Sequence, residues 1–425
     1  AQITASAFAA LTTGVVSTLS GTQVGALTTD QVKALTTAQA VALTSVQAAG
    51  VTTVQTGSLE SGDLNKLTTS AFAALEPGVV ATLNGTQVGA LTTAQVAALT
   101  TAQAAQLTSV QAAGITTSQA VGLESGDLSK LTTDAFAAIA PSVVASLGGA
   151  QVGALTTDQV GALTTAQAVA LTSVQAGGVT ASQTAAIEST DLAQITASAF
   201  AALTTGVVST LSGTQVGALT TDQVKALTTA QAVALTSVQA AGVTTVQTGS
   251  LESGDLNKLT TSAFAALEPG VVATLNGTQV GALTTAQVAA LTTAQAAQLT
   301  SVQAAGITTV QTTAIESTDL AKLTTDAFAA IGTGVVAGLT SAQVNALTTD
   351  QVGALTTAQA LALTTTQTVG LSDTQVGALE STDLQKVTTS AFAAIGAGAI
   401  VGLSSAQVSA LTTAQAVSLQ AQQLQ

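Results

Sequence analysis

The sequence predicts an all-α fold, a tight solenoid of very short helices with one helix in each eight-residue repeat. Three observations carry this prediction. An aliphatic residue recurs at every eighth position, a helix-capping pattern recurs inside each repeat, and prolines and glycines keep fixed places within it. These signals place both a helix start and a helix stop within every eight residues.

The repeat, which we call the octad, is defined by its first residue. This residue is Leu, Ile or Val at all 53 positions taken in steps of eight from Ile3 to Leu419, and we call it position 1. A typical octad runs from Leu91 to Ala98, and Leu99 begins the next one at once. Such a period is typical of repeat proteins, in which neighbouring units share one continuous core.

A capping box marks where each helix begins. In the spacing of Thr92 and Gln95, the Thr oxygen accepts from the third amide of the helix, and the Gln side chain reaches back to the amide of the cap. Position 2 is therefore the predicted N-cap and position 3 the first helical residue. Proline is well tolerated at that first position because its missing N–H is not needed there. All three prolines occupy position 3: Pro77, Pro141 and Pro269.

Two further residue types agree with these helix boundaries. Acidic residues at position 4 lie in the first turn and face the positive end of the helix dipole; they include Asp30, Asp134, Asp158, Asp222, Asp326 and Asp350. Glycines at position 7 predict that helices end in a left-handed residue; they include Gly25, Gly89, Gly153, Gly217 and Gly281.

Longer periods organise the octads. All seven phenylalanines fall at position 6 and are 64 residues apart, so eight octads form a module: Phe8, Phe72, Phe136, Phe200, Phe264, Phe328 and Phe392. A module of this size suggests two or four octads in each superhelical turn. Residues 1–117 recur unchanged as residues 193–309, which gives a higher repeat of 192 residues. We predict a single repeat array over residues 1–425, divided into 1–192, 193–384 and a partial copy at 385–425.

Two other folds compete with the helical solenoid. In one continuous helix the aliphatic stripe would drift by about 80° per octad, and no single buried seam would form. A β-solenoid is the second alternative, favoured by Thr and Val, but strict alternation would bury a row of Gln beside the row of Leu. The abundance of Ala and Gln also disfavours strands.

The predicted core consists of positions 1 and 6. Helices this short are unstable alone, so stacking between neighbours has to hold them, and small Ala residues at positions 7 and 8 permit close approach. Phe at position 6 is interpreted as a packing element, with a partner-binding stripe as the alternative.

The composition excludes several classes of function. Charged residues make up 7% of the chain, the net charge is -14, and Cys, His, Met, Trp, Tyr and Arg are absent. Nucleic acid and anionic membrane surfaces would repel such a chain, and no apolar run approaches the roughly 18 residues of a membrane span. We expect no enzymatic activity and no cofactor, because no candidate nucleophile stands beside a base.

The only candidate sites are octads in which Glu and Asp stand three residues apart, once in each module. Paired carboxylates suit a hard cation, so a row of weak calcium sites is one hypothesis, and helix capping is the other. The candidate residues are Glu60, Asp63, Glu124, Asp127, Glu188, Asp191, Glu252, Asp255, Glu316, Asp319, Glu380 and Asp383. A further alternative is ice binding by the Thr-Thr pairs, which would require a flat exposed β face.

Octads such as Leu291 to Gln298 and Leu347 to Ala354 resemble the Thr/Gln/Ala-rich repeat tracts of giant secreted bacterial surface and matrix proteins. That resemblance implies export by a type I pathway and an extracellular or cell-surface location, for example in a biofilm matrix. The Gly-Gly-x-Gly-x-Asp calcium nonapeptides common in such proteins do not occur here.

Two functions follow. The first is a structural protein that associates with itself into a fibre, filament or surface layer. The alternative is the passive stalk of an adhesin that displays a separate binding domain.

Overall fold

The computed structural model describes residues 3–420 and 423. All regular elements in this part of the chain are short helices and none is a strand, so the prediction of a helical solenoid is confirmed. The chain forms two compact units, Ala1–Leu211 and Ser212–Gln425. This spatial division does not coincide with the sequence repeat at residue 192, and each unit is described by itself.

Unit 1 contains 24 described α-helices of four to six residues and two 3-10 turns. They are α1 (Ala5–Ala9), α2 (Thr13–Val16), α3 (Gly21–Gly25), α4 (Thr29–Lys33), α5 (Thr37–Ala42), α6 (Ser45–Ala48), η1 (Thr56–Ser58), α7 (Ser61–Leu64), α8 (Thr69–Ala73), α9 (Pro77–Val80), α10 (Gly85–Ala90), α11 (Thr93–Ala97), α12 (Thr101–Ala104), α13 (Ser109–Ala112), α14 (Thr117–Ala120), α15 (Ser125–Leu128), α16 (Thr133–Ala137), α17 (Pro141–Val144), α18 (Gly149–Gly153), α19 (Thr157–Gly161), α20 (Thr165–Ala170), α21 (Ser173–Ala176), η2 (Thr184–Ala186), α22 (Ser189–Leu192), α23 (Ala197–Ala201) and α24 (Thr205–Val208).

Unit 2 repeats the pattern with 25 described α-helices and one 3-10 turn. They are α25 (Gly213–Ala218), α26 (Thr221–Lys225), α27 (Thr229–Ala234), α28 (Ser237–Ala240), α29 (Thr245–Thr248), α30 (Ser253–Leu256), α31 (Thr261–Ala265), α32 (Pro269–Val272), α33 (Gly277–Ala282), α34 (Thr285–Ala289), α35 (Thr293–Ala296), α36 (Ser301–Gly306), η3 (Thr312–Ala314), α37 (Ser317–Leu320), α38 (Thr325–Ala329), α39 (Thr333–Gly338), α40 (Ser341–Asn345), α41 (Thr349–Gly353), α42 (Thr357–Ala362), α43 (Thr365–Thr368), α44 (Asp373–Ala378), α45 (Ser381–Leu384), α46 (Thr389–Ala393), α47 (Ala397–Ile400), α48 (Ser405–Ala410) and α49 (Thr413–Ser418).

The α-helices begin where the capping box predicts, at position 3 of the octad. At α11 the Gln95 amide donates to the Thr92 hydroxyl at 3.1 Å, and the Thr92 amide donates to the Gln95 side-chain oxygen at 2.9 Å. Pro77, Pro141 and Pro269 are each the first residue of a helix. The helix starts could therefore be read from local chemistry alone.

The helix ends differ from the prediction. No glycine in the described residues has a positive φ, so the left-handed exit expected at position 7 is wrong. Instead the chain leaves the helix through an extended position 1 residue, as at Leu91, where φ is -58° and ψ is 144°. Turning ψ at a non-glycine residue ends the helix without left-handed geometry.

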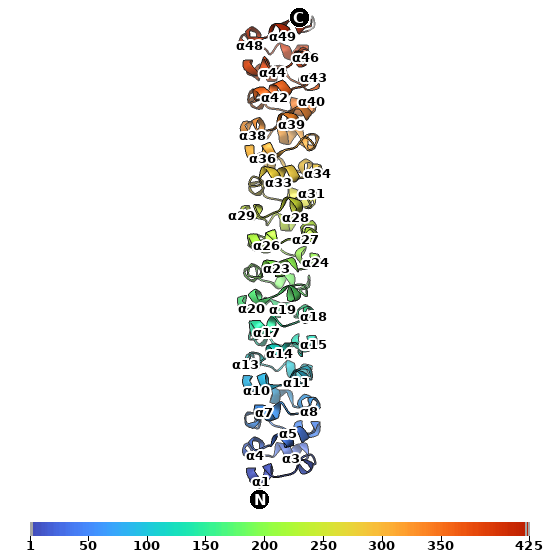
Figure 1. The fold of residues 1–425 in the computed structure, drawn as a ribbon, viewed down its shortest axis with the longest axis vertical. Helices are drawn as coiled ribbons and strands as arrows, with labels where there is room; N and C mark the ends of the chain where they lie inside the picture. Colours follow the sequence, from blue (N-terminus) through green and yellow to red (C-terminus); the bar gives the residue numbers. More distant parts are fainter. Residues whose placement is uncertain (1–2, 421–422, 424–425) are drawn as a thin grey trace. The chain divides into compact units, whose positions relative to one another are not determined.

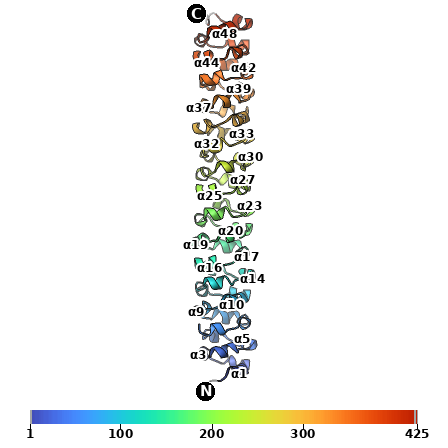
Figure 2. The ribbon, with the colours of Figure 1, turned by 90° about the vertical axis from the view of Figure 1, so that its left-hand side faces the viewer.

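Stacking sets the length of the superhelical turn. Helices three octads apart are in contact, such as α10 with α13 and α16 with α19, and they lie one above the other in Figures 1 and 2. The side chain of Gln95 bonds carbonyls 28 and 31 residues earlier, at the joint between two octads. A turn of the superhelix therefore takes between three and four octads. The expectation of two or four octads is wrong, because the octads of one turn lie over the joints between octads of the turn before it and not directly over the octads themselves.

The core contains the predicted rows and one row that was not predicted. Leu91, Val96 and all seven Phe side chains are buried, as expected for positions 1 and 6. Gln at position 5 is buried too, with Gln95 only 1% exposed. A β-solenoid was disfavoured because it would bury a row of Gln, but the helical fold buries a row of Gln as well. The row is tolerated because these Gln amides are hydrogen-bonded to backbone groups.

The glycines serve close packing between turns. A Cβ atom on Gly114 would lie 2.2 Å from the Gly85 carbonyl oxygen, and one on Gly89 would lie 2.9 Å from the Gly114 oxygen. Contacts of this kind leave no room for a side chain. Similar trios recur in other modules, as at Gly149, Gly153 and Gly178.

Candidate functional site

The octads with Glu and Asp replace the usual capping box. Glu60 is the N-cap of α7, is exposed, and makes no side-chain cap hydrogen bond. Asp63 stands at position 5, where most octads have Gln, and is 8% exposed. The two carboxylates therefore occupy different environments, one in solvent and one in the core.

Four of these Asp side chains accept a hydrogen bond from a Thr hydroxyl of the preceding turn. The Thr37 hydroxyl donates to Asp63 at 3.0 Å across 26 residues of sequence. The same bond joins Thr165 to Asp191 at 3.0 Å, Thr229 to Asp255 at 3.1 Å and Thr357 to Asp383 at 2.7 Å. These Thr residues had no assigned role in the sequence, because the contact depends on the stacking of turns.

Burial changes the acidity of three of these groups. Burial raises the pKa of the Asp63 carboxyl, the hydrogen bond from Thr37 lowers it, and the charge of Glu60 adds to the rise. For Asp127, burial and then Glu124 raise the pKa, and Thr101 lowers it.

Asp319 behaves similarly without a Thr contribution. Burial raises its pKa most, followed by the charge of Glu316. In all three groups the neutral acid is favoured because the surroundings solvate the charge poorly.

The calcium hypothesis gains no third acidic ligand from the fold. Among the described residues, no group of three or more Asp, Glu, His or Cys side chains is placed to hold a metal ion. In each pair the Glu is the N-cap of a helix and the Asp follows it three residues later. Every pair therefore offers two carboxyl groups at most. Calcium normally takes six to eight oxygen ligands. Calcium binding at these pairs stays an untested hypothesis beside helix capping.

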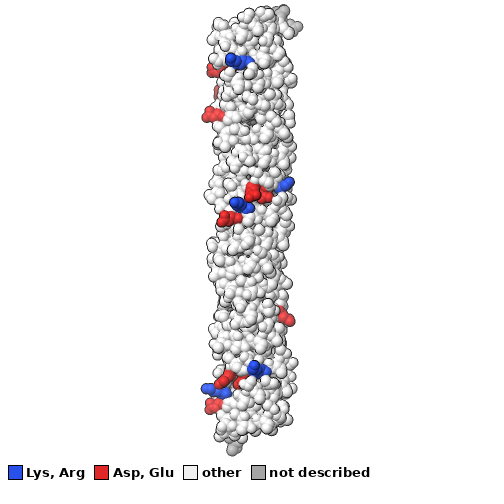
Figure 3. Space-filling view, in the orientation of Figure 1, with Lys and Arg blue, Asp and Glu red and all other residues white. Residues whose placement is uncertain are grey.

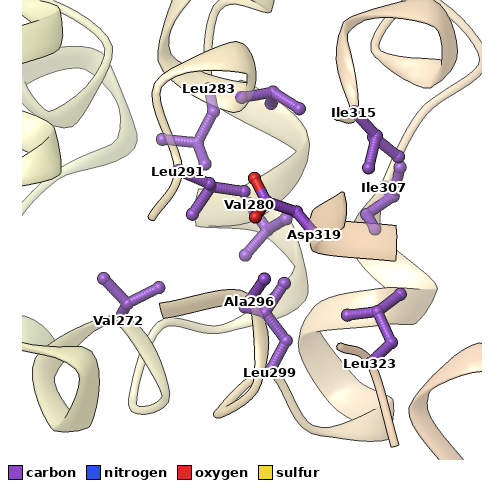
Figure 4. Close-up of a pocket in the computed structure, with 11 residues that line it drawn as sticks. Val272, Val280, Leu283, Leu291, Ala296, Leu299, Ile307, Ile315, Asp319 and Leu323 are labelled. Atoms are coloured by element: carbon purple, nitrogen blue, oxygen red, sulfur yellow. The ribbon is translucent and has the colours of Figure 1, made fainter. Parts of the chain in front are cut away.

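Small apolar cavities lie beside two of the Asp residues. One in unit 2 has a volume of about 20 Å³ and is lined by aliphatic side chains and Asp319. In Figure 4 the Asp319 carboxyl group lies between Leu291 and Val280. An equivalent cavity of about 20 Å³ in unit 1 adjoins Asp191. Each has room for about one water molecule, so neither is a pocket for an organic ligand.

The cavity in unit 2 follows from a substitution in the Gln row. Elsewhere Gln at position 5 bonds carbonyls 28 and 31 residues earlier, as Gln287 bonds Leu259 and Leu256 at 2.9 Å. Counted from Asp319, these positions are Leu291 and Val288, which both line the cavity. Asp is one methylene shorter than Gln, and its ionised form cannot donate a hydrogen bond. The interior therefore loses both volume and a donor at this place.

The surface is poor in charge. Figure 3 shows a few acidic and basic side chains in separate groups, with wide uncharged areas between them on the face in view. Several valines are exposed within uncharged stretches, including Val110 at 61% and Val302 at 62%. This surface consists mainly of Thr, Ser, Ala and Val, and the part of the chain that is described presents no concentrated charge for a charged ligand.

Open hollows recur at one place in the two units. That in unit 1 has a volume of about 620 Å³ and is lined by Glu60, Ser61 and Asn84, among others. That in unit 2, of about 770 Å³, is lined by the counterparts Glu252 and Asn276. Both lie where glycine allows two turns to approach closely.

The sequence repeats match a known family. No described helix is long enough to cross a lipid bilayer. No curated protein matches the chain. The model of the ALTTAQ repeat matches residues 1–37, 72–109, 120–165, 136–173, 264–301, 312–349 and 328–365, which together cover just over half of the sequence. The protein is a repeat protein with the architecture of a helical solenoid, and it belongs to the ALTTAQ repeat family.

Proposed function

We propose that the protein is a structural repeat protein whose array builds an extracellular fibre, filament or surface layer. The observation that carries this proposal is the Gln ladder, in which position 5 of one octad bonds backbone carbonyls of the turn before it. Gln95 does so with Leu64 and Leu67, and Gln287 repeats it with Leu256 and Leu259 at 2.9 Å. Each added octad extends the same core without a new kind of contact.

Self-association is part of this proposal. The surface combines sparse charge with exposed valines such as Val46 at 68% and Val238 at 62%. Like-charge repulsion between copies is therefore weak over the uncharged stretches, and burial of Val is favourable by about 25 cal/mol per Å². The net charge of -14 opposes nucleic acid as a partner. A structural role of this kind requires no catalysis.

The passive stalk of an adhesin is the alternative function. It uses the same solenoid as a spacer, and any binding would be done by a separate domain. Ice binding by the Thr-Thr pairs would need a flat β face, and the described residues contain no strand that could form one. An extracellular location follows only from the resemblance to secreted repeat tracts.

Electron microscopy of the purified protein tests the main proposal. We expect ordered filaments or sheets that grow with concentration, with sedimentation velocity showing species heavier than the 40.9 kDa chain. Monodisperse particles at every concentration would contradict self-assembly and favour the stalk. Immunogold labelling of the producing cells tests the location, since label confined to the cell interior would contradict an extracellular role.

A further inference from the structure

Five asparagines occur in the chain. They fall into two groups, according to whether the backbone N–H of the following residue donates a hydrogen bond. Asn65 and Asn257 precede Lys66 and Lys258. The amides of these lysines donate to the backbone carbonyl oxygens of Asp63 and Asp255 at 3.0 Å. The amide after Asn345 belongs to Ala346 and donates to the Ala342 carbonyl at 3.1 Å. In all three cases the following N–H is occupied by a hydrogen bond.

Asn84 and Asn276 differ because each precedes the first residue of a helix. Gly85 begins α10 and Gly277 begins α33, so neither amide has a carbonyl four residues back within its helix to which it could donate. Among the described residues, neither amide donates a hydrogen bond to a backbone carbonyl outside its own helix. Both asparagines are also exposed to solvent.

The N-cap geometry polarises the side chain of the same asparagine. The Gln87 amide donates to Asn84 Oδ1 at 2.9 Å, and the Gln279 amide donates to Asn276 Oδ1 at 2.9 Å. A donor on this oxygen stabilises the negative charge that develops there when a nucleophile attacks Cγ. The nucleophile within the chain is the nitrogen of the following glycine, which has no Cβ to hinder the approach.

We propose that Asn84 and Asn276 are sites of spontaneous deamidation in the folded protein. The Gly85 nitrogen forms a bond to Asn84 Cγ, the bond from Cγ to Nδ2 breaks, and ammonia leaves with the proton of the glycine amide. Water then opens the cyclic imide to Asp or to isoaspartate. The net reaction consumes one water and releases one ammonia, with no oxidation or reduction.

The structure also explains why this dipeptide stands here. Position 3 favours Gly, because a Cβ on Gly85 would make a tight contact of 3.0 Å with the Val110 carbonyl oxygen. Position 2 favours a capping side chain, which is Ser20 or Ser212 in other modules, although Gly148 also occurs there. Conversion to Asp preserves the cap and adds a negative charge. Isoaspartate adds a methylene to the backbone where Gly85 and Gly114 pack closely, so it loosens the stacking.

The test is incubation of the full chain in mildly alkaline buffer, followed by tryptic digestion and mass spectrometry. Peptides 67–130 and 259–322 each contain one Asn, at 84 and 276, and peptide 323–386 contains only Asn345. We expect the first two to gain one mass unit several-fold faster than the third, and a methyltransferase specific for isoaspartate to label them. Equal rates in all three peptides would overturn the proposal.

Two further arms separate the effect of the fold from that of the dipeptide. N84S and N276S, which copy the Ser caps of other modules, remove the rapid gain at their own peptide and keep the melting temperature. In denaturant the amides after Asn65, Asn257 and Asn345 become free, so we expect the rate ratio to fall. A ratio unchanged by unfolding would contradict a role for the folded structure.

Discussion

The Nε2 group of Gln95 donates to the Leu67 carbonyl oxygen at 2.9 Å, across 28 residues of sequence and from one turn of the solenoid to the turn before it. The same nitrogen donates to Leu64 at 2.9 Å, and the side-chain oxygen accepts the Thr92 amide. One side chain thus caps its own helix and ties two turns together.

Replacing this residue tests how much the ladder contributes. Gln95→Leu leaves the Thr92 amide and the Leu67 carbonyl without partners, whereas the Leu64 carbonyl still accepts from the Leu67 amide. We therefore expect a loss of about 2 kcal/mol or more in the free energy of unfolding. Chemical denaturation measures it. Gln106→Leu is the matched control, because Gln106 is exposed, and its effect should stay within about 0.5 kcal/mol. Equal effects would contradict the ladder.

Close packing of the glycines gives a second prediction. In Gly114→Ala the new Cβ would lie 2.2 Å from the Gly85 oxygen, so the two turns have to separate, at a cost of about 1–3 kcal/mol. The control is Gly126→Ala, where no atom lies within 4 Å of the added Cβ, and we expect a gain of about 0.4–1 kcal/mol. Thermal denaturation followed by circular dichroism compares the two. Equal melting temperatures would refute the packing role.

Restoring Gln at position 5 of the octad that contains Asp319 should stabilise unit 2. Asp319→Gln supplies the donor and the methylene that position 5 has in other octads, and it fills the cavity beside Leu291, so we expect a gain of about 1 kcal/mol. Urea denaturation gives the change. Glu316→Gln removes a charge at the exposed N-cap of the same helix and serves as the control. A destabilised D319Q protein would show that the Gln geometry does not transfer to this octad.

The buried carboxyl groups make stability depend on pH. In Asp63, Asp127 and Asp319 the pKa of the folded state is raised above the ordinary value of 3.8. Their contribution is therefore fully present below that value and is lost as pH rises through the raised pKa values. We expect the melting temperature to increase on acidification from neutral pH. The triple variant D63N/D127N/D319N should respond less, and an equal response would assign the effect to other groups.

Calcium is the subject of the fifth prediction. Because each Glu and Asp pair lacks a third acidic ligand among the described residues, we expect neither a chelator nor added calcium to change the melting temperature or the assembly. Differential scanning calorimetry and electron microscopy measure both. A rise in melting temperature with calcium that is lost in E316Q/D319N would establish the sites instead.

Much of the local structure could be read from the octad. Thr92, Gln95 and Pro77 fix the helix starts through contacts within a few residues, which depend on local chemistry alone. The glycines were misread because Gly89 fits a helix end equally well as a left-handed exit or as a close contact. The contact that decides between these readings comes from Gly114, in a later turn of the solenoid.

The candidate site was predicted only in part. The place of Asp63 in the Gln slot follows from the repeat, but its inward direction and its bond to Thr37 do not. The helix starts predict that the backbone amides after Asn84 and Asn276 have no partner within the helix. That the amide after Asn345 is hydrogen-bonded could be known only once the end of α40 was known.

The sequence by itself determined the helix in each octad, its cap and the aliphatic rows of the core, because these depend on periodicity and on contacts between near neighbours. Only the tertiary structure decided that a turn holds between three and four octads, that the Gln row is buried, and that glycines face glycines. The physical reason is that stacking joins residues about 25 to 31 positions apart. Their pairing depends on how far each joint turns the chain, and no single octad specifies that angle.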